Sequence, residues 1–158
     1  ILEICDLPVE QPRNLHPKRP VSGLDWPKEE GSGTRLWGLL SEQYGSGENI
    51  LSKVFLVNHC PLMLFSGNRA TNITPDKISG SIIRLLLERC DEHLREIVDI
   101  LGITTVIGVG KFAEKRALKA LSDTEIEIKT CWHPSPASPL ANRNGGADWR
   151  NNVRSVLP

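Results

Sequence analysis

A long helical period at the centre of the chain, flanked by two apolar runs, most constrains what this sequence can fold into. Apolar residues recur at helical spacing from Ile78 to Leu101, and Gly102 stands where a left-handed C-terminal cap belongs. Thr74 and Pro75 suit the start of a helix, as N-cap and first helical residue. The spacing therefore predicts one helix over 74–102, or two helices if Gly80 splits it.

The segments on both sides of this helix predict an α/β fold. Continuous apolar runs predict buried parallel strands at 53–58 and 104–110, and alternation predicts a third strand at 126–130. Apolar stripes predict further helices at 34–44, 111–121 and 147–156. Strands that alternate with helices indicate a mainly parallel sheet. Ligands bind such sheets at the carboxyl ends of the strands.

Length and composition fit one globular domain over residues 1–158. Hydrophobic residues make up 39% and charged residues 24%, and no apolar run is long enough for a membrane span, so we expect no membrane partner. The four cysteines form no CxxC pair, which indicates reduced, buried thiols rather than disulfides or zinc. The start of the chain has neither Met nor a signal-peptide pattern, so we expect it to come from the middle of a longer chain.

The charge distribution excludes a broad basic face but leaves room for a local one. The formal net charge is zero, whereas residues 111–158 carry 8 Lys and Arg against 5 Asp and Glu. A protein that binds only a few phosphates needs only a local basic patch. Residues 16–21 form a basic, proline-stiffened loop within the irregular segment 8–34, either a DNA-backbone contact or a solvated connector. Lys115, Arg116 and Lys119 are predicted to form a solvated helix face.

Two strand ends carry polar side chains that suit base chemistry. The Asn58 amide offers one acceptor and two donors, which match the imide edge of uracil. A neutral imidazole at His133 can donate a hydrogen bond to the negative charge that develops on a leaving base. Either residue alone also fits a plain strand-end turn. The parallel order predicts that both lie at the same rim of the sheet.

The segment after His133 has the composition of a stiff, DNA-probing loop. Three prolines rigidify it, two serines offer hydroxyl and N–H groups, and Leu140 is an apolar tip suited to wedging into a base stack. The predicted DNA-contacting residues are Pro134, Ser135, Pro136, Ala137, Ser138, Pro139, Leu140, Ala141, Asn142 and Arg143. Gly110 and Lys111 follow a strand and could receive a phosphate at a helix start, although such glycines also simply allow a tight turn. A surface loop with ordinary turn chemistry remains the alternative for 133–142.

Taken together, these motifs resemble the single-strand-selective monofunctional family of uracil-DNA glycosylases. The resemblance rests on the ordered segments 55–62, 66–68, 72–75, 108–114, 133–136 and 141–142, with 16–21 and 37–38 in support. It implies a three-layer α/β/α fold without metal or cofactor. It also implies a nuclear, monomeric repair enzyme that removes uracil and 5-hydroxymethyluracil from single- and double-stranded DNA. Asn58 then corresponds to the pyrimidine-recognition residue, His133 to the catalytic histidine, and 134–143 to the loop that enters the duplex.

The sequence departs from the family pattern in two places. The family's first motif, a GMNPGPFG-like segment on the first strand, carries an Asn that positions water and an aromatic residue that stacks on the base, and it has no counterpart here. The expectation is a domain without its first strand and with impaired activity. In addition, residues 144–148 delay Trp149, so the predicted wedge is either longer or has its tip shifted.

Two other interpretations compete with the glycosylase. The chain could be an impaired fragment or degenerate relative that only binds DNA. It could also be an unrelated α/β hydrolase or nucleotide-binding protein, but the sequence has no GxSxG motif, phosphate-binding loop motif or metal-ligand cluster.

Overall fold

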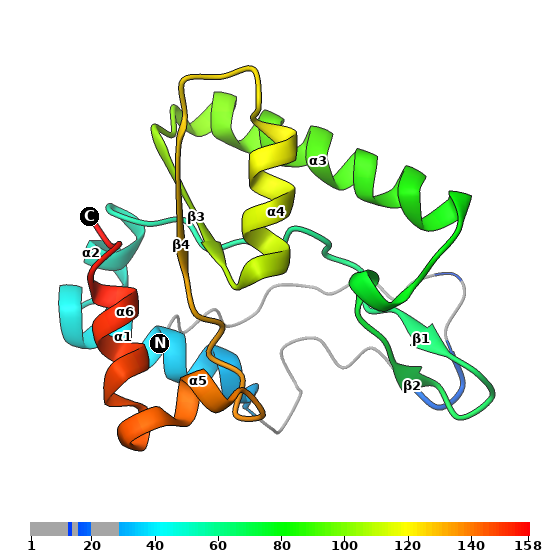
Figure 1. The fold of residues 1–158 in the computed structure, drawn as a ribbon, viewed down its shortest axis with the longest axis horizontal. Helices are drawn as coiled ribbons and strands as arrows, with labels where there is room; N and C mark the ends of the chain where they lie inside the picture. Colours follow the sequence, from blue (N-terminus) through cyan, green and yellow to red (C-terminus); the bar gives the residue numbers. More distant parts are fainter. Residues whose placement is uncertain (1–12, 14–15, 20–28) are drawn as a thin grey trace.

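The computed structural model describes residue 13 and residues 16–19 and 29–158. Its helices are α1 (Gly31–Tyr44), α2 (Gly47–Leu51), α3 (Ser81–Leu101), α4 (Lys111–Ala120), α5 (Pro139–Asn142) and α6 (Ala147–Arg154). Its strands are β1 (Phe65–Ser66), β2 (Thr71–Asn72), β3 (Thr105–Val109) and β4 (Glu127–Cys131), and single 3-10 turns lie at η2 (Pro75–Lys77) and η3 (Arg143–Gly146). Figure 1 shows this arrangement. Among these helices none is both long and apolar enough to cross a bilayer.

The centre of the fold is a β3–α4–β4 unit, and it confirms the α/β class. β3 and β4 pair in parallel, from Thr105 opposite Glu127 to Val109 opposite Cys131. α4 packs against both strands and against α3, and Figure 1 shows α4 beside the strands and crossing α3. The parallel pairing predicted for the second and third strands is confirmed. The complete three-layer sheet stays a prediction.

Side chains alternate across the two strands and join two separate cores. Val106 and Ile128 pack with a cluster from α3 and α4 that contains Val98 and Leu121. Ile107 and Val109 face the opposite way, toward a larger cluster built from α1, α2, β4, α5 and α6, whose buried members are Leu36, Leu39, Leu40, Ile50, Cys131, Ala141, Trp149 and Val153. The period-two alternation of a strand therefore lets this small sheet bury both of its faces.

Gly108 allows α4 to lie directly on β3. A Cβ atom placed on Gly108 would stand 2.5 Å from both Cα and N of Glu114 in α4. Real Cβ atoms essentially never come that close to another heavy atom. The helix can therefore approach the strand this closely only because residue 108 has no side chain.

The central helical segment is split at Gly80, which is the second of the two arrangements predicted from the sequence. η2 covers Pro75–Lys77, and α3 begins at Ser81 after Gly80, whose φ of 116° favours glycine. Gly102 closes α3 in the left-handed conformation, with φ 60° and ψ 40°. Thr74 makes no side-chain capping bond. At the first turn Ile82 and Leu85 are 84% and 63% exposed, so the start of α3 is not covered by the described part of the chain.

The strand predicted at 53–58 is wrong for this structure. Residues 54–58 have no regular secondary structure, and Phe55, Leu56 and Val57 are exposed. A buried parallel strand needs a hydrogen-bonded neighbour, and no described segment pairs with this one. Instead, an antiparallel hairpin that the sequence did not predict follows: β1 and β2 pair through Phe65 with Asn72 and Ser66 with Thr71.

The burial predicted for the thiols is confirmed for two of the three cysteines that the structure describes. Cys60 is half-buried, Cys90 and Cys131 are buried, and all three are free. Burial raises the pKa of the Cys131 thiol to about 11. Cys5 lies outside the described residues. No group of three or more His, Cys, Asp or Glu in the described ranges could hold a metal ion.

Candidate functional site

The carboxyl end of β4 is fixed to α6 by two hydrogen bonds. The backbone N–H of Trp132 donates to Oδ1 of Asn152 over 2.8 Å, and the indole N–H of Trp149 donates to the carbonyl oxygen of Trp132 over 2.9 Å. Trp149 itself is buried, 3% exposed. The next residue, His133, therefore projects from a rigid support rather than from a free loop.

His133 is exposed, and its ring orientation is set by its own loop. The backbone N–H of Ser135 donates to Nδ1 of His133 over 3.1 Å. Nδ1 is thus the acceptor, so the proton of the neutral ring lies on Nε2. The exposed ring therefore keeps an Nε2–H donor, which is the form that can stabilise a developing anion.

Gly110, the last residue before α4, lies against His133. A Cβ atom on Gly110 would stand 3.1 Å from Cβ of His133, and the φ of 87° at Gly110 favours glycine. The N–H of Gly110 donates to the carbonyl oxygen of Cys131 over 2.8 Å. The structure therefore brings together two of the predicted site segments. The Gly110 N–H is already bonded, while Lys111 is exposed and pairs with Glu114 at 2.8 Å.

The loop from Pro134 to Arg143 folds back on itself. Ser135 accepts hydrogen bonds from the N–H of Ser138, at 2.9 Å to its carbonyl oxygen, and of Ala137, at 3.3 Å to its hydroxyl oxygen. Leu140 is 45% exposed, whereas Ala141 is 1% exposed and belongs to the core under α6. The exposed residues of the loop are Pro136, Ala137, Pro139, Leu140, Asn142 and Arg143, while Pro134 is buried and Ser135 and Ser138 are half-buried.

Arg35 of α1 holds this loop, and sequence reasoning missed it. Its guanidinium donates to the carbonyl oxygens of Pro134 at 3.2 Å and Ala141 at 3.5 Å, and to Oδ1 of Asn142 at 2.9 Å. Asn142 in turn donates from Nδ2 to the carbonyl oxygen of Pro136 over 2.7 Å. No sequence signal marks Arg35, because its partners lie about a hundred residues further along the chain.

The start of α1 brings a carboxylate to the same region. Glu30 caps α1 by accepting from the N–H groups of Ser32 and Gly33. Partial burial works to raise the pKa of Glu30, but these backbone hydrogen bonds bring it below its usual range. A Cβ atom on Gly31 would lie 3.1 Å from Cγ of Pro136, so the helix start also contacts the loop.

Replacing Arg35 by methionine should loosen the loop because three acceptors lose a charged donor. Hydrogen bonds to charged groups contribute about 1.5–3 kcal/mol each, and water replaces some of them here, so we expect a loss of about 2 kcal/mol in the free energy of unfolding. Urea denaturation measures it. The backbone amides of Ala137 and Ser138 should also exchange hydrogen faster. Lys115, which is exposed on α4, provides the matched control as Lys115→Met, and equal effects of the two substitutions would contradict the role of Arg35.

The residues that lengthen the loop form a tight turn before α6. Asn144, Gly145 and Gly146 all adopt positive φ, at 49°, 65° and 89°. Asn144 donates to Oδ1 of Asp148 over 2.9 Å, and Nε of Arg143 pairs with Oδ2 of Asp148 at 3.0 Å. An open cleft of about 360 Å³ lies beside this turn, lined by Arg35, Ala141, Asn142, Gly145, Gly146, Trp149 and Arg150. Neither His133 nor Asn58 lines this cleft.

Asn58 is exposed and does not lie at the end of a sheet strand. The rim at which two strands would bring Asn58 and His133 together is therefore not present in the described part of the chain. The neighbouring residue, His59, is nevertheless firmly held. Its Nε2 lies 2.9 Å from Oδ1 of Asp91, and its ring meets Phe112 of α4 edge-on, with centroids 6.0 Å apart.

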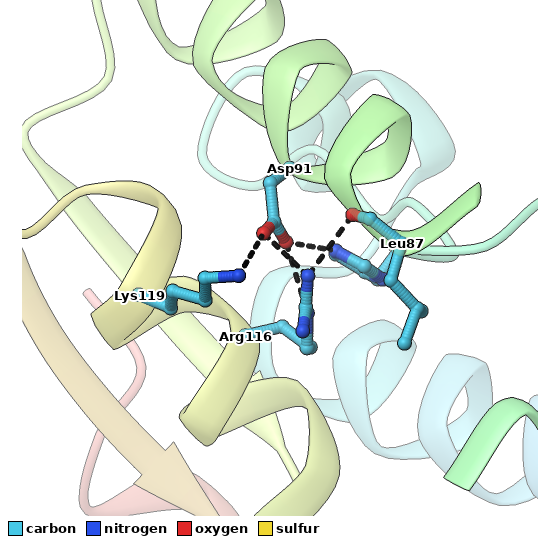
Figure 2. A network of polar contacts seen from close by, with 5 residues as sticks. Leu87, Asp91, Arg116 and Lys119 are labelled. Carbon is cyan, nitrogen blue, oxygen red and sulfur yellow. Dashed lines mark hydrogen bonds and ion pairs between the residues drawn. The ribbon is translucent and has the colours of Figure 1, made fainter. Parts of the chain in front are cut away.

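Asp91 is the centre of a buried polar cluster between α3 and α4. Arg116 donates from Nε to Oδ1 of Asp91 over 2.9 Å and from Nη2 to Oδ2, and Nη2 also donates to the carbonyl oxygen of Leu87 over 3.0 Å. Figure 2 shows Arg116 and Lys119 converging on Asp91. The prediction of a solvated face is wrong for Arg116, since its side chain is only 13% exposed. Lys115 and Lys119 are exposed as predicted.

The basic loop before α1 contacts the β1–β2 hairpin. Arg19 donates from Nε and Nη2 to the carbonyl oxygen of Ala70, at 3.2 and 2.9 Å, and its guanidinium lies 5.4 Å from the ring centroid of Phe65. Lys18 donates to the carbonyl oxygen of Asn68 over 2.9 Å. These contacts fix the described part of the loop to the hairpin. Pro20, Val21 and most of segment 8–34 lie outside the described residues.

Comparison with known proteins gives one consistent result. No protein-family model matches the chain. A protein of Bos taurus named single-strand selective monofunctional uracil DNA glycosylase is 41% identical over 155 residues, which cover 96% of this chain and 57% of that protein. Proteins of the same name from Mus musculus and Rattus norvegicus are 38% and 40% identical over 151 residues, covering 94% of this chain and 54% and 52% of their own lengths. The chain spans about half the length of the curated relatives it matches.

Proposed function

The chain belongs to the family of single-strand selective monofunctional uracil DNA glycosylases, and we propose that the full-length protein removes uracil from DNA in base-excision repair. The observation that carries the proposal is the state of His133. Its Nδ1 accepts from the N–H of Ser135, so Nε2–H is the donor that remains on an exposed side chain after β4. An uncharged donor at that place suits a leaving group that departs as an anion.

His133 acts in this proposal by stabilising the departing base. The C1′–N1 bond breaks with its electron pair moving to the uracil, which leaves as an anion, and the Nε2–H of His133 donates to the oxygen that carries this charge. Water attacks C1′ and releases its proton to solvent, and the uracil anion takes up a proton from water. His133 stays neutral throughout. No amine of the protein bonds to the sugar, so the DNA strand is left intact.

In the same proposal, Asn58 recognises the base. Its amide presents an acceptor to N3–H of uracil and a donor to O4. The residue that follows Asn58 packs on the first turn of α4: His59 contacts Phe112, two residues after Gly110, and Gly110 lies against His133. These short links support a shared site for Asn58 and His133.

The loop 134–143 supplies the DNA contacts. Pro139 and Leu140 are exposed at the start of α5, which supports a wedge that enters the stack when the base leaves it. Lys111 adds a phosphate contact at the start of α4, and Gly110, whose N–H is bonded to Cys131, shapes the turn before it. The buried side chains of Pro134 and Ala141 limit these two residues to positioning and backbone contacts.

Four finer points belong to the proposal. The substrates include 5-hydroxymethyluracil besides uracil, in both single- and double-stranded DNA, and the family name supports a preference for single strands. The full-length protein is a monomer, acts in the nucleus and completes the three-layer α/β/α sheet. A relative that only binds DNA is the alternative, and the Nε2–H donor of His133 speaks against it, because binding alone needs no such group.

The deciding experiment is excision by the full-length protein from a labelled single-stranded oligonucleotide with one uracil. We expect free uracil and an abasic site that breaks only after alkali, with no product when thymine replaces uracil. The same oligonucleotide annealed to its complement, and one with 5-hydroxymethyluracil, test the finer points. Tight binding without abasic product would overturn the glycosylase proposal in favour of the DNA-binding alternative.

A further inference from the structure

We propose that His59, fixed by Asp91, is a positioning residue that holds Asn58 in place for base recognition. This inference rests on the proposed role of Asn58 as the residue that reads the base. It adds a reason why an exposed side chain outside any strand can recognise one base over another.

Asn58 needs such a support because its own segment provides little. Residues 54–58 have no regular secondary structure, and Phe55, Leu56 and Val57 are exposed. Recognition through a planar amide depends on direction as well as distance. The first well-anchored side chain after this stretch is that of His59, and consecutive Cα atoms lie about 3.8 Å apart. Fixing His59 therefore restricts where Asn58 can lie.

The ring of His59 is held by a hydrogen bond at Nε2 and by an aromatic contact. Nε2 donates to Oδ1 of Asp91 over 2.9 Å, and the ring packs edge-on against Phe112 at an interplanar angle of 82°. The side chains of His59 and Asp91 are 9% and 11% exposed, so water competes little for this bond. A ring fixed by both a hydrogen bond and a perpendicular aromatic contact keeps one rotamer.

Asp91 is itself immobilised, which gives the hydrogen bond a fixed direction. Arg116 binds both carboxylate oxygens and the carbonyl oxygen of Leu87, so it ties α4 to α3 around Asp91 (Figure 2). Lys119 adds a distant charge at 4.0 Å from Oδ2. α4 begins next to Gly110, against which His133 lies. The same helix therefore supports the residue beside Asn58, and its N-cap lies against His133.

One buried atom indicates that this cluster serves more than stability. Nδ1 of His59 is buried and has no hydrogen-bond partner among the described residues. A buried acceptor without a partner costs free energy, and such groups are uncommon in folded proteins. A cluster kept only for stability would more simply place an apolar side chain at this position. An imidazole that must reach Asp91 explains why the cost is tolerated.

Two substitutions of His59 in the full-length protein test whether the side chain at this position must reach Asp91 or must be an imidazole. Glutamine carries an amide N–H2 at about the distance of Nε2, whereas asparagine carries the same amide one methylene shorter and cannot reach Asp91. We expect His59→Asn to lower kcat/KM for uracil excision roughly 10- to 100-fold, the range for a misplaced site residue. His59→Gln should stay within about threefold of the wild type, since it restores the bond to Asp91.

The test of positioning repeats His59→Asn in an Asn58→Ala background, at a temperature where thermal unfolding shows every variant folded. If His59 acts through Asn58, the substitution has no further effect there, because nothing remains to be positioned. The same fold-loss in both backgrounds, or wild-type activity of His59→Asn, overturns the inference. Wild-type activity of Asn58→Ala instead overturns the proposed role of Asn58, so the two failures are distinguishable.

A milder variant covers the case in which His59→Asn does not fold. Phe112→Leu removes the edge contact with the His59 ring and leaves the buried polar groups in place. We expect a smaller loss of kcat/KM, about three- to tenfold, that also disappears in the Asn58→Ala background. A loss that persists there shows that the ring contact acts elsewhere and overturns the inference.

Discussion

Replacing His133 by alanine is expected to lower the single-turnover rate constant of uracil excision about 100- to 1000-fold, the usual effect of removing one preorganised donor from a developing oxyanion. The reason is local. The N–H of Ser135 fixes Nδ1 as acceptor, and Nε2–H is the donor that remains for the base. Affinity for an oligonucleotide that already contains the abasic site should change little, because the lost interaction forms as the bond breaks.

His93 provides a matched control for this substitution. It is an exposed histidine on α3 whose Nδ1 lies 3.8 Å from Oε2 of Glu96, so His93→Ala removes the same side chain away from the site. Its rate constant should stay within about twofold of the wild type, as for ordinary surface changes. A His133→Ala protein that excises uracil as fast as His93→Ala would contradict the proposed role of His133.

The second large effect concerns stability and falls on Gly108. Gly108→Ala places a Cβ atom 2.5 Å from backbone atoms of Glu114, so α4 must move away from β3. Overpacking usually costs about 1–3 kcal/mol and sometimes more. Because the clash is with backbone rather than a flexible side chain, we expect a loss of about 3 kcal/mol in the free energy of unfolding, measured by urea denaturation.

Gly38 is the glycine to compare with Gly108. It lies inside α1, and a Cβ atom there would meet nothing within 4 Å. Gly38→Ala should therefore raise the free energy of unfolding by about 0.5–1 kcal/mol, because alanine loses less backbone entropy in a helix. The two substitutions add the same methyl group with opposite expected signs. A stable Gly108→Ala protein would mean that α4 does not rest on β3 at this point.

The β3–α4–β4 unit could be predicted from the sequence because its signals are local and agree. Apolar runs of the right length, a capping glycine at 102 and the stripe of α4 all indicated the same arrangement. The run at 53–58 carried the same kind of signal and was wrong for this structure. A continuous apolar run marks a segment that can be buried, but a strand also needs a neighbour, and local sequence does not contain that neighbour.

The candidate site, like the fold, could be predicted from the sequence only in part. The position of His133 and its proline-rich loop after a strand end was predictable, because these residues and the strand are adjacent in the chain. The contacts that hold the site were not. Arg35 reaches acceptors about a hundred residues away, and Arg116 turned inward from a helix whose charges indicated a solvated face. A buried partner such as Asp91 reverses that expectation only when its place in three dimensions is known.

The tryptophans behind the loop make intrinsic fluorescence a reporter of this part of the molecule. Trp37, Trp132 and Trp149 all belong to one core cluster, and the chain has four tryptophans in total. Three of its four tryptophans, and with them most of its near-ultraviolet absorption, therefore lie in the core that supports His133. The indole of Trp149 is bonded to the carbonyl oxygen of Trp132, so a shift at the end of β4 changes the surroundings of two chromophores together. Intrinsic fluorescence can therefore report a change in the core behind His133 without any added dye.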